Sequence, residues 1–284
     1  MIVARTVERV RDIVKKTKKK GRLIGFIPTM GALHEGHLSL IRGAHKECDF
    51  VVVSIFVNPT QFGAGEDFHS YPRDFKKDES LLKKEGVNLV FYPKVSTMYP
   101  KDFSTYVEEV SLSKYLCGKF RPGHFRGVCT VVVKLFNIVT PDIAYFGQKD
   151  FQQAQIIKRM VRDLNFPIKI KILPIIREKD GLAMSSRNSY LSSHQRKLAP
   201  YLYKSLILAK ELILKKKYSP LKIRNEVKRF IKRNIPSAKI DYIDIVSPET
   251  LQELKKIDKG KILVALAVYL GRARLIDNIL VRVR

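Results

Sequence analysis

Strand-like and helix-like patterns alternate along the first 176 residues of this chain, and this alternation restricts its fold more than any other feature. Short apolar runs between turn residues are typical of buried strands, whereas apolar residues that recur every three or four positions are typical of helices. The alternation predicts a Rossmann-like α/β fold, a parallel sheet with helices on both faces. The expected strands cover residues 23–27, 50–57, 87–92, 102–110, 143–146 and 168–176, and the expected helices run through residue 44 and over residues 75–85, 131–139 and 151–164.

The pattern changes after Tyr190. Two long helical patterns, over residues 193–217 and 221–234, are followed by three strand-like runs over residues 240–246, 262–270 and 274–283. Helices followed by a group of strands predict a smaller α+β domain with a short antiparallel sheet. We therefore divide the chain into a Rossmann-like domain, residues 1–176, and a C-terminal domain, residues 177–284.

The first twenty residues combine valines at positions 3, 7, 10 and 14 with many lysines, as basic amphipathic and transit-type helices do. Two acidic residues, Glu8 and Asp12, weaken the transit interpretation. Only Gly21 and Arg22 separate this pattern from the first expected strand. We interpret the segment as the first helix of the domain.

The composition is that of a globular protein from a reducing compartment. The chain has 284 residues, of which 45% are hydrophobic, enough for substantial buried cores. Its three cysteines are odd in number and form no C-x-x-C pair, which argues against a disulfide scaffold. The longest strongly apolar run has nine residues, 262–270, whereas a membrane-spanning helix needs about 20. We expect a cytoplasmic protein without a membrane partner.

The formal net charge of +27 and the pI near 10.0 favour a different class of function, because lysine and arginine attract nucleic acids and acidic membranes. The basic residues are dispersed, however, in groups at 15–20, 76–77, 215–217 and 232–233. No aromatic-interleaved RNA-binding motif accompanies them. Nucleic-acid binding therefore remains the secondary hypothesis.

Residues 28–40 place two histidines, His34 and His37, where a buried strand is expected to give way to a helix. Gly31 and Gly36 mark the turn between them. Free backbone N–H groups and the positive end of the helix dipole favour an anion at such a helix start, and positions i and i+3 share one helical face. The segment therefore predicts a phosphate site, although a pair of solvated histidines is the alternative. A helical zinc pair would need i and i+4 spacing, which this segment lacks.

A second polar cluster, residues 177–189, follows the expected strand 168–176. It contains Ser185, Ser186 and Arg187 in a glycine-bearing loop. An arginine fork and neighbouring hydroxyl groups match the oxygens of a polyphosphate. Alone, this loop is better explained as a solvated turn.

Together, H-E-G-H at 34–37 and M-S-S-R at 184–187 resemble the HIGH and KMSKS motifs of nucleotide-activating enzymes. Three further blocks narrow the resemblance: F-V-N-P-T-Q-F at 56–62, R-P-G-H-F-R-G-V at 121–128 and F-G-Q-K-D-F-Q-Q at 146–153. These five blocks, in this order over nearly the whole chain, are similar to those of the pantothenate synthetase (pantoate–β-alanine ligase) family.

The resemblance implies an enzyme that uses ATP, with Mg²⁺, to join pantoate to β-alanine. Pantoate is first converted to an acyl adenylate with release of pyrophosphate, and the β-alanine amine then displaces AMP to give pantothenate. A homodimer is also expected from the family. The smaller C-terminal domain would act as a lid that closes over the nucleotide and excludes water from the adenylate.

Roles in ATP binding carry over from the matching blocks. His34 and His37 would contact the phosphates, with His37 as proton donor, and surrounding phosphate charge would favour the protonated imidazole. Lys149 would neutralise charge at the transferring phosphorus, whereas Asp150 would bind either ribose or Mg²⁺. Ile176 would lie beside adenine, although core packing also explains it. The other residues assigned to ATP are Met30, Gly31, Ala32, Leu33, Glu35, Gly36, Gly147, Gln148, Met184, Ser185, Ser186 and Arg187.

Gln61 and Gln153 are assigned to pantoate on the same resemblance, with Asn58 assisting and Gln61 also bordering the β-alanine site. A neutral amide can orient a carboxylate without holding it in a strong ion pair. His124 and Arg126 fit either a substrate rim or a simple turn. A related nucleotidylyltransferase and a tRNA-activating enzyme remain alternative functions, but no RNA-binding extension is recognisable.

Overall fold

The computed structural model describes residues 1–215 and 218–284. Contacts divide them into two compact units, which we describe separately. The N-terminal unit comprises Met1–Ser111, Arg121–Gln148 and Gln153–Pro174, and the C-terminal unit comprises Leu112–Phe120, Lys149–Gln152 and Ile175–Arg284. The division at residues 176 and 177, with a catalytic domain and a lid, stays a prediction.

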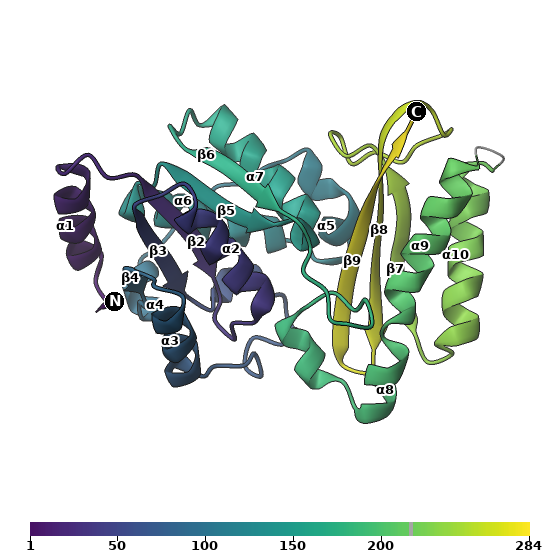
Figure 1. The fold of residues 1–284 in the computed structure, drawn as a ribbon, viewed down its shortest axis with the longest axis horizontal. Coiled ribbons are helices and arrows are strands. Elements are labelled where there is room, and N and C mark those ends of the chain that lie inside the picture. The colour runs from purple at the N-terminus through teal and green to yellow at the C-terminus, as the bar shows by residue number, and fades with distance from the viewer. Residues whose placement is uncertain (216–217) are drawn as a thin grey trace. The chain divides into compact units, whose positions relative to one another are not determined.

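A six-stranded parallel sheet forms the centre of the N-terminal unit, in the order β1-β4-β3-β2-β5-β6 (Figure 1). This arrangement confirms the predicted fold class. The strands are β1 (Ile2–Ala4), β2 (Ile24–Thr29), β3 (Phe50–Ile55), β4 (Leu89–Phe91), β5 (Ile143–Gly147) and β6 (Lys169–Leu173).

Helices pack on both faces of this sheet because alternate strand residues point to opposite sides. Ile27 and Val53 share one buried cluster with residues of α2 and α3. Phe26, the neighbour of Ile27 on β2, instead meets Phe136 of α6 edge to face, with ring centroids 6.3 Å apart. The helices whose residues lie mainly in this unit are α1 (Val7–Lys18), α2 (Glu35–His45), α3 (Phe75–Lys84), α4 (Val95–Met98), α6 (His124–Val139) and α7 (Phe151–Asp163).

The order of the strands places a topological switch point between β2 and β5. From β2 the chain proceeds to β3 and β4 on one side, and β5 and β6 later extend the sheet on the other. The two strands are directly paired, with Gly25 opposite Ile143 and Phe26 opposite Ala144. In open α/β sheets, ligands bind beyond the carboxyl ends of the strands at such a point. The H-E-G-H block follows the carboxyl end of β2. The F-G-Q-K-D block contains the last two residues of β5 and continues beyond its carboxyl end, so both blocks begin at the carboxyl edge of the sheet.

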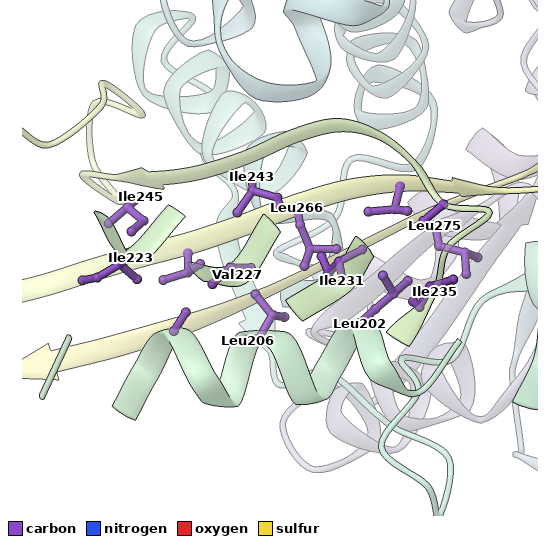
Figure 2. Packing of buried hydrophobic residues seen from close by; sticks show 14 of the residues in the cluster. Leu202, Leu206, Ile223, Val227, Ile231, Ile235, Ile243, Ile245, Leu266 and Leu275 are labelled. Carbon is purple, nitrogen blue, oxygen red and sulfur yellow. The ribbon is translucent and has the colours of Figure 1, made fainter. Parts of the chain in front are cut away.

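In the C-terminal unit, two helices cover one antiparallel sheet of order β7-β8-β9. Figure 2 shows the apolar residues between them, such as Leu206 of α9, Val227 of α10 and Leu266 of β8, all of which are fully buried. This core is built from the amphipathic stripes that the sequence displays. The elements are α5 (Leu116–Phe120), α8 (Ser193–Leu198), α9 (Tyr201–Leu214), α10 (Pro220–Asn234), β7 (Lys239–Val246), β8 (Gly260–Leu270) and β9 (Ala273–Val283).

Some predicted elements were wrong. Residues 102–110 form no strand, and the Val107 N–H donates instead to the hydroxyl group of Thr130 on α6 (3.0 Å). The segment thus bonds to a helix side chain in place of a neighbouring strand. The first residues are not all helical either, because Ile2–Ala4 form β1 and pair with β4.

Other predicted elements differ in extent. The helix expected over residues 193–217 is two helices, α8 and α9, because Pro200 cannot donate the hydrogen bond that would continue α8. Two of the three lysines in the expected basic group 215–217, at positions 216 and 217, lie outside the described residues. Helix α6 begins at His124, seven residues before its predicted start at 131. Strand β6 ends at Leu173, just before Pro174.

In the described ranges 1–215 and 218–284, we find no helix with the length and apolar character needed to cross a membrane.

Candidate active site

The imidazole rings of His34 and His37 close the N-terminus of α2. His34 is the N-cap residue, and its Nδ1 accepts a hydrogen bond from the Gly36 N–H (3.1 Å). The Nδ1 of His37 accepts the N–H of His34 in return (3.3 Å), which completes a capping box. The ring centroids are 4.1 Å apart. The histidines that sequence analysis singled out are thus a matched pair at a helix start.

These cap bonds determine the proton positions. A nitrogen that accepts a hydrogen bond carries no proton, so each neutral ring holds its proton on Nε2 and donates from that atom. A protonated ring would have a hydrogen on Nδ1 and would lose its cap bond. With both caps formed, each ring carries Nε2–H, the type of donor that an anion at this helix start would need.

A buried carboxylate shapes the loop between β2 and α2. Asp78 of α3 accepts the backbone N–H groups of Ala32 (2.9 Å) and Leu33 (2.8 Å). Burial raises the pKa of Asp78, and the two backbone hydrogen bonds act in the opposite direction. Gly31 has a φ of +82°, and a Cβ built on it would lie 2.9 Å from Asp78 Oδ2. This loop therefore requires glycine at position 31.

Gln61 lies in the turn after β3, and Asn58 and Met30 hold its side chain. The Asn58 amide donates to Gln61 Oε1 (3.0 Å), and Gln61 Nε2 donates to the sulfur atom of Met30 (3.1 Å). Thioether sulfur is a weak acceptor, so a ligand oxygen would be a stronger partner for this N–H group. The structure thus brings together three of the predicted residues.

Asn58 itself is almost fully buried, with 1% of its surface exposed. Its Nδ2 also donates to the Gly127 carbonyl (3.1 Å), and its Oδ1 accepts the hydroxyl groups of Tyr99 (2.8 Å) and Thr60 (2.9 Å). A Cβ on Gly127 would collide with the backbone of Thr60, so glycine lets α6 approach this turn. These contacts favour a supporting role for Asn58 beside Gln61.

Other predicted residues follow β5. Gly147 is the last residue of the strand, Gln148 begins a short 3₁₀ turn, and Gln153 lies half-buried in the first turn of α7. Apart from its two chain neighbours, no described residue has an atom within 4 Å of a Cβ built on Gly147. The backbone is therefore open to close approach at this point.

Lys149 and Asp150 belong to the C-terminal unit. Lys149 Nζ lies 3.6 Å from the Asp150 carboxylate, and the two side chains are 20% and 48% exposed. The amide of Asn278 on β9 donates to the Lys149 carbonyl (3.0 Å). Strand β9 therefore helps to fix the backbone of the candidate catalytic lysine.

The second predicted phosphate motif is a compact loop of the C-terminal unit. The Ile176 carbonyl accepts the Met184 N–H (3.0 Å), which closes the loop at its base. Ser185 caps the 3₁₀ turn Ser186–Tyr190 by accepting the Arg187 N–H (3.2 Å). These two bonds keep Ser185, Ser186 and Arg187 together on one short turn.

The base of this loop is also held by a buried ion pair. Arg177 donates two hydrogen bonds to the carboxylate of Asp277 on β9 (2.6 and 2.9 Å) and stacks on Tyr203, 3.8 Å from the ring centroid. Asp277 is only 4% exposed, and burial raises its pKa although Arg177 acts to lower it.

The predicted site residues thus form two described groups. One surrounds the start of α2 and Gln61 in the N-terminal unit, and the other includes Lys149 and the 184–187 loop in the C-terminal unit. That both groups contact one triphosphate stays a prediction.

Several supporting residues are not among the predicted site residues, including Asp78, Asp277 and Asn278, whereas Arg121, which donates to the Gln61 carbonyl (3.4 Å), appears in the sequence only as the first residue of the 121–128 block. Asp78 had a signal, because it occupies the apolar stripe of α3 between Phe75 and Leu82, where an acidic residue is unusual. Asp277 and Asn278 are recognised only from contacts between distant segments.

Among the described residues, no group of three or more His, Cys, Asp or Glu side chains is arranged to hold a metal ion. Asp150 remains a half-exposed carboxylate beside Lys149. Magnesium ions in nucleotide-using enzymes commonly bind through one or two carboxylates and the substrate phosphates, and a single such residue fits that donor set.

A parallel sheet with a capped helix start at its switch point defines a Rossmann-like protein suited to binding a nucleotide. The model of the family described as pantoate–β-alanine ligase matches residues 2–280. This chain belongs to the pantoate–β-alanine ligase family.

Two named relatives are similar over almost their entire length. A pantothenate synthetase from Thermosipho melanesiensis is 59% identical over 281 residues, with 99% of each chain covered. One from Fervidobacterium nodosum is 56% identical over 281 residues, again with 99% of each chain covered.

Solved structures agree in fold. Pantothenate synthetase from Thermus thermophilus has a TM-score of 0.92 at 45% identity, covering 98% of this chain and 99% of its own. Pantoate–β-alanine ligase from Francisella tularensis, described as complexed with β,γ-ATP and β-alanine, has a TM-score of 0.81 at 37% identity and covers 99% of this chain and 97% of its own.

Proposed function

We propose that this chain condenses (R)-pantoate with β-alanine in an ATP-dependent reaction that passes through pantoyl adenylate and yields pantothenate, AMP and pyrophosphate. The observation that carries the proposal is the pair of capped imidazoles at the start of α2, at the switch point of a sheet in a chain of this family. The Francisella tularensis relative, described with β,γ-ATP and β-alanine, supports the choice of substrates.

In the first step, a carboxylate oxygen of pantoate attacks the α-phosphorus of ATP, and the bond from that phosphorus to the bridging β-oxygen breaks. Such a displacement depends mainly on positioning and on stabilisation of charge. The N-terminus of α2 and the Nε2–H groups of His34 and His37 would donate to the phosphates. Lys149 would neutralise charge at the α-phosphorus, and Ser185, Ser186 and Arg187 would bind the outer phosphates.

The remaining ATP-binding assignments follow the two loops. The backbone of residues 30–36 and of Gly147 would approach the nucleotide closely, with Gln148 beside it and Ile176 near adenine. His37 would act as the donor to pyrophosphate through Nε2. Full protonation of its ring would break the Nδ1 cap bond, so the cap opposes the protonated form that phosphate charge favours.

In the second step, the amine of β-alanine attacks the acyl carbon, and the bond between that carbon and the AMP oxygen breaks. Gln61 and Gln153 would orient pantoate through neutral amide groups, and Gln61 would border the β-alanine site. Because a neutral amide forms no strong ion pair with the pantoate carboxylate, the carboxylate keeps its nucleophilicity for the first step. Asn58 would assist by holding Gln61.

The cofactor, assembly and location form part of the same proposal. Mg²⁺ would be held by the ATP phosphates with Asp150 as its protein carboxylate, where it would offset phosphate charge; ribose binding is the alternative role of Asp150. The protein would be a cytoplasmic homodimer. Residues 177–284 would act as a lid over a catalytic domain formed by residues 1–176.

An isotope experiment tests the adenylate directly. Pantoate labelled with ¹⁸O in its carboxylate is incubated with ATP, Mg²⁺ and β-alanine, and AMP is analysed by mass spectrometry. The proposed chemistry transfers one labelled oxygen to each AMP, because that oxygen forms the new bond to phosphorus and stays there when the acyl carbon is attacked.

Unlabelled AMP, or ADP in place of AMP, would contradict the adenylate route. A nucleotidylyltransferase would instead retain the nucleotide in its organic product. Omitting β-alanine is the control, since pantothenate and free AMP then cease to accumulate.

A further inference from the structure

The R-P-G-H-F-R-G block, which sequence analysis could assign either to a substrate rim or to a turn, is bonded to Gln61. The Gln61 carbonyl oxygen accepts a hydrogen bond from His124 Nδ1 (2.8 Å) and a longer one from Arg121 (3.4 Å). His124 is the first residue of α6, where Gly123, with a φ of +77°, starts the helix. Two side chains at this helix start thus converge on the backbone of the residue proposed to bind pantoate.

Contacts within the block determine the tautomer of His124. Arg121 Nη1 lies 2.9 Å from His124 Nε2, and a guanidinium N–H can only donate. His124 Nε2 is therefore the acceptor, and the ring proton resides on Nδ1, where it is donated to the Gln61 carbonyl. Arg121 thus stabilises the His124 tautomer that carries its proton on Nδ1, which is the tautomer that can donate to the Gln61 carbonyl.

A carboxylate fixes Arg121 in turn. Glu66, five residues after Gln61, accepts two hydrogen bonds from the guanidinium (2.7 and 2.6 Å). The side chains of Arg121 and Glu66 are only 13% and 24% exposed. Burial acts to raise the pKa of Glu66, but Arg121, together with smaller contributions from Gly63 and His124, lowers it overall. The pair is therefore ionised and ordered by two-point contact.

The other end of Gln61 is fixed independently, because Asn58 donates to its side-chain oxygen and Nε2 contacts Met30. The turn that carries Gln61 is a single 3₁₀ turn, Pro59–Gln61, which depends on such contacts for a defined geometry. Gln61 itself is 8% exposed.

We propose that Glu66, Arg121 and His124 form a positioning relay that fixes the Gln61 backbone and thereby the orientation of its amide toward pantoate. This inference rests on the proposed function, from which the role of Gln61 is taken. The three residues act through Gln61 and do not themselves contact the reacting atoms.

Two substitutions of His124 distinguish the loss of its hydrogen bond to Gln61 from the loss of its side-chain volume. In His124→Asn the amide nitrogen takes nearly the place of imidazole Nδ1 and can still donate to Gln61, whereas in His124→Gln the amide nitrogen lies nearer the place of Nε2. The readout is pantoate-dependent exchange of labelled pyrophosphate into ATP. We expect H124Q to raise the KM for pantoate about tenfold with the KM for ATP unchanged, and H124N to stay within about twofold of the wild type.

Glu66→Gln provides a second variant at a more exposed position, should H124Q fail to fold. It removes the charge that orients Arg121, and we expect it to raise the KM for pantoate about threefold to tenfold, again without a change for ATP. Arg162→Gln is the control, because the Arg162 side chain on α7 is 69% exposed and pairs with the neighbouring Asp163, away from every residue assigned to the site. This variant should leave both KM values unchanged.

The outcomes distinguish this inference from the proposed function. Equal increases in the KM for ATP and for pantoate, or an unchanged KM for pantoate in both E66Q and H124Q, would overturn the positioning relay while leaving the ligase assignment intact. Wild-type protein without pantoate-dependent exchange would overturn the proposed function and the relay with it.

Discussion

Gly31 combines a left-handed backbone with a crowded Cβ position beside Asp78 and Ile55. We predict that Gly31→Ala lowers the free energy of unfolding by about 1–3 kcal/mol and raises the KM for ATP, because the added methyl group displaces the loop before α2. Chemical denaturation and pyrophosphate-exchange kinetics provide the measurements.

Gly65→Ala is the matched control for Gly31→Ala. Gly65 has a similar φ of +79°, but apart from its two chain neighbours no described residue has an atom within 4 Å of a Cβ built on it. The loss of unfolding free energy in G65A should therefore reflect backbone strain alone. Equal losses of stability in the two variants, with an unchanged KM for ATP in G31A, would show that contact with Asp78 does not shape the loop.

Asp244 on β7 gives the protein a pH-dependent stability. Burial, with a smaller contribution from Glu253, raises its pKa from 3.8 to about 6, against the effect of Arg224 and Lys119. Between these values the folded state holds more protons than the unfolded state, so this residue lowers stability as the pH rises from about 4 to 6. Asp244→Asn removes the effect and should stabilise the protein by about 2 kcal/mol at pH 7.

Denaturation of D244N and wild type across pH 4–7 measures this difference. Asp258→Asn, at a side chain that is 61% exposed, is the control and should change the free energy of unfolding by less than about 0.5 kcal/mol. If the free energies of unfolding of D244N and wild type changed in parallel across this pH range, the pH dependence would not come from the raised pKa of Asp244.

An ion pair between Arg177 and Asp277 connects the segment before the 184–187 loop to β9. Breaking a buried ion pair leaves an uncompensated charge, so Asp277→Asn should lower the free energy of unfolding by about 3 kcal/mol. The double variant Arg177→Met with Asp277→Asn should lose less than the sum of the single variants, because neither charge remains unpaired. Additive losses in urea denaturation would mean that the pair is not coupled.

Sequence patterns predicted the elements whose residues carry their own signal. The buried strands β2, β3 and β5 consist mostly of apolar residues, and the amphipathic stripe of α10 is visible in its spacing. The short strand β1 and the irregular segment 102–110 lack such a signal, because their structure depends on the residues that they contact, β4 for the former and Thr130 for the latter. Boundaries set by one proline, as between α8 and α9, were also missed.

The same distinction applies to the candidate site. His34 and His37 could be singled out because they stand three residues apart beside turn glycines, which is a local pattern. Their capping box and its effect on the proton positions follow only from coordinates. Arg121, His124 and Glu66 lie 60, 63 and 5 residues from Gln61, and no local pattern connects them.

At the scale of the whole molecule, the proposed function predicts that the start of α2 and the 184–187 loop contact one ATP molecule, with pantoate beside it. Neither motif alone explains adenylation, because the displacement needs donors around both the reacting and the departing phosphates. The wide spread of its basic residues is compatible with anionic substrates, but the net charge of +27 has no explanation in these contacts.

Exchange of labelled pyrophosphate into ATP, without β-alanine, tests this requirement most directly. Wild-type protein should catalyse exchange only when pantoate is present, and His37→Gln and Arg187→Gln should each reduce kcat/KM for ATP at least about tenfold. Exchange that proceeds without pantoate, or wild-type rates in R187Q, would contradict a single triphosphate site built from both motifs.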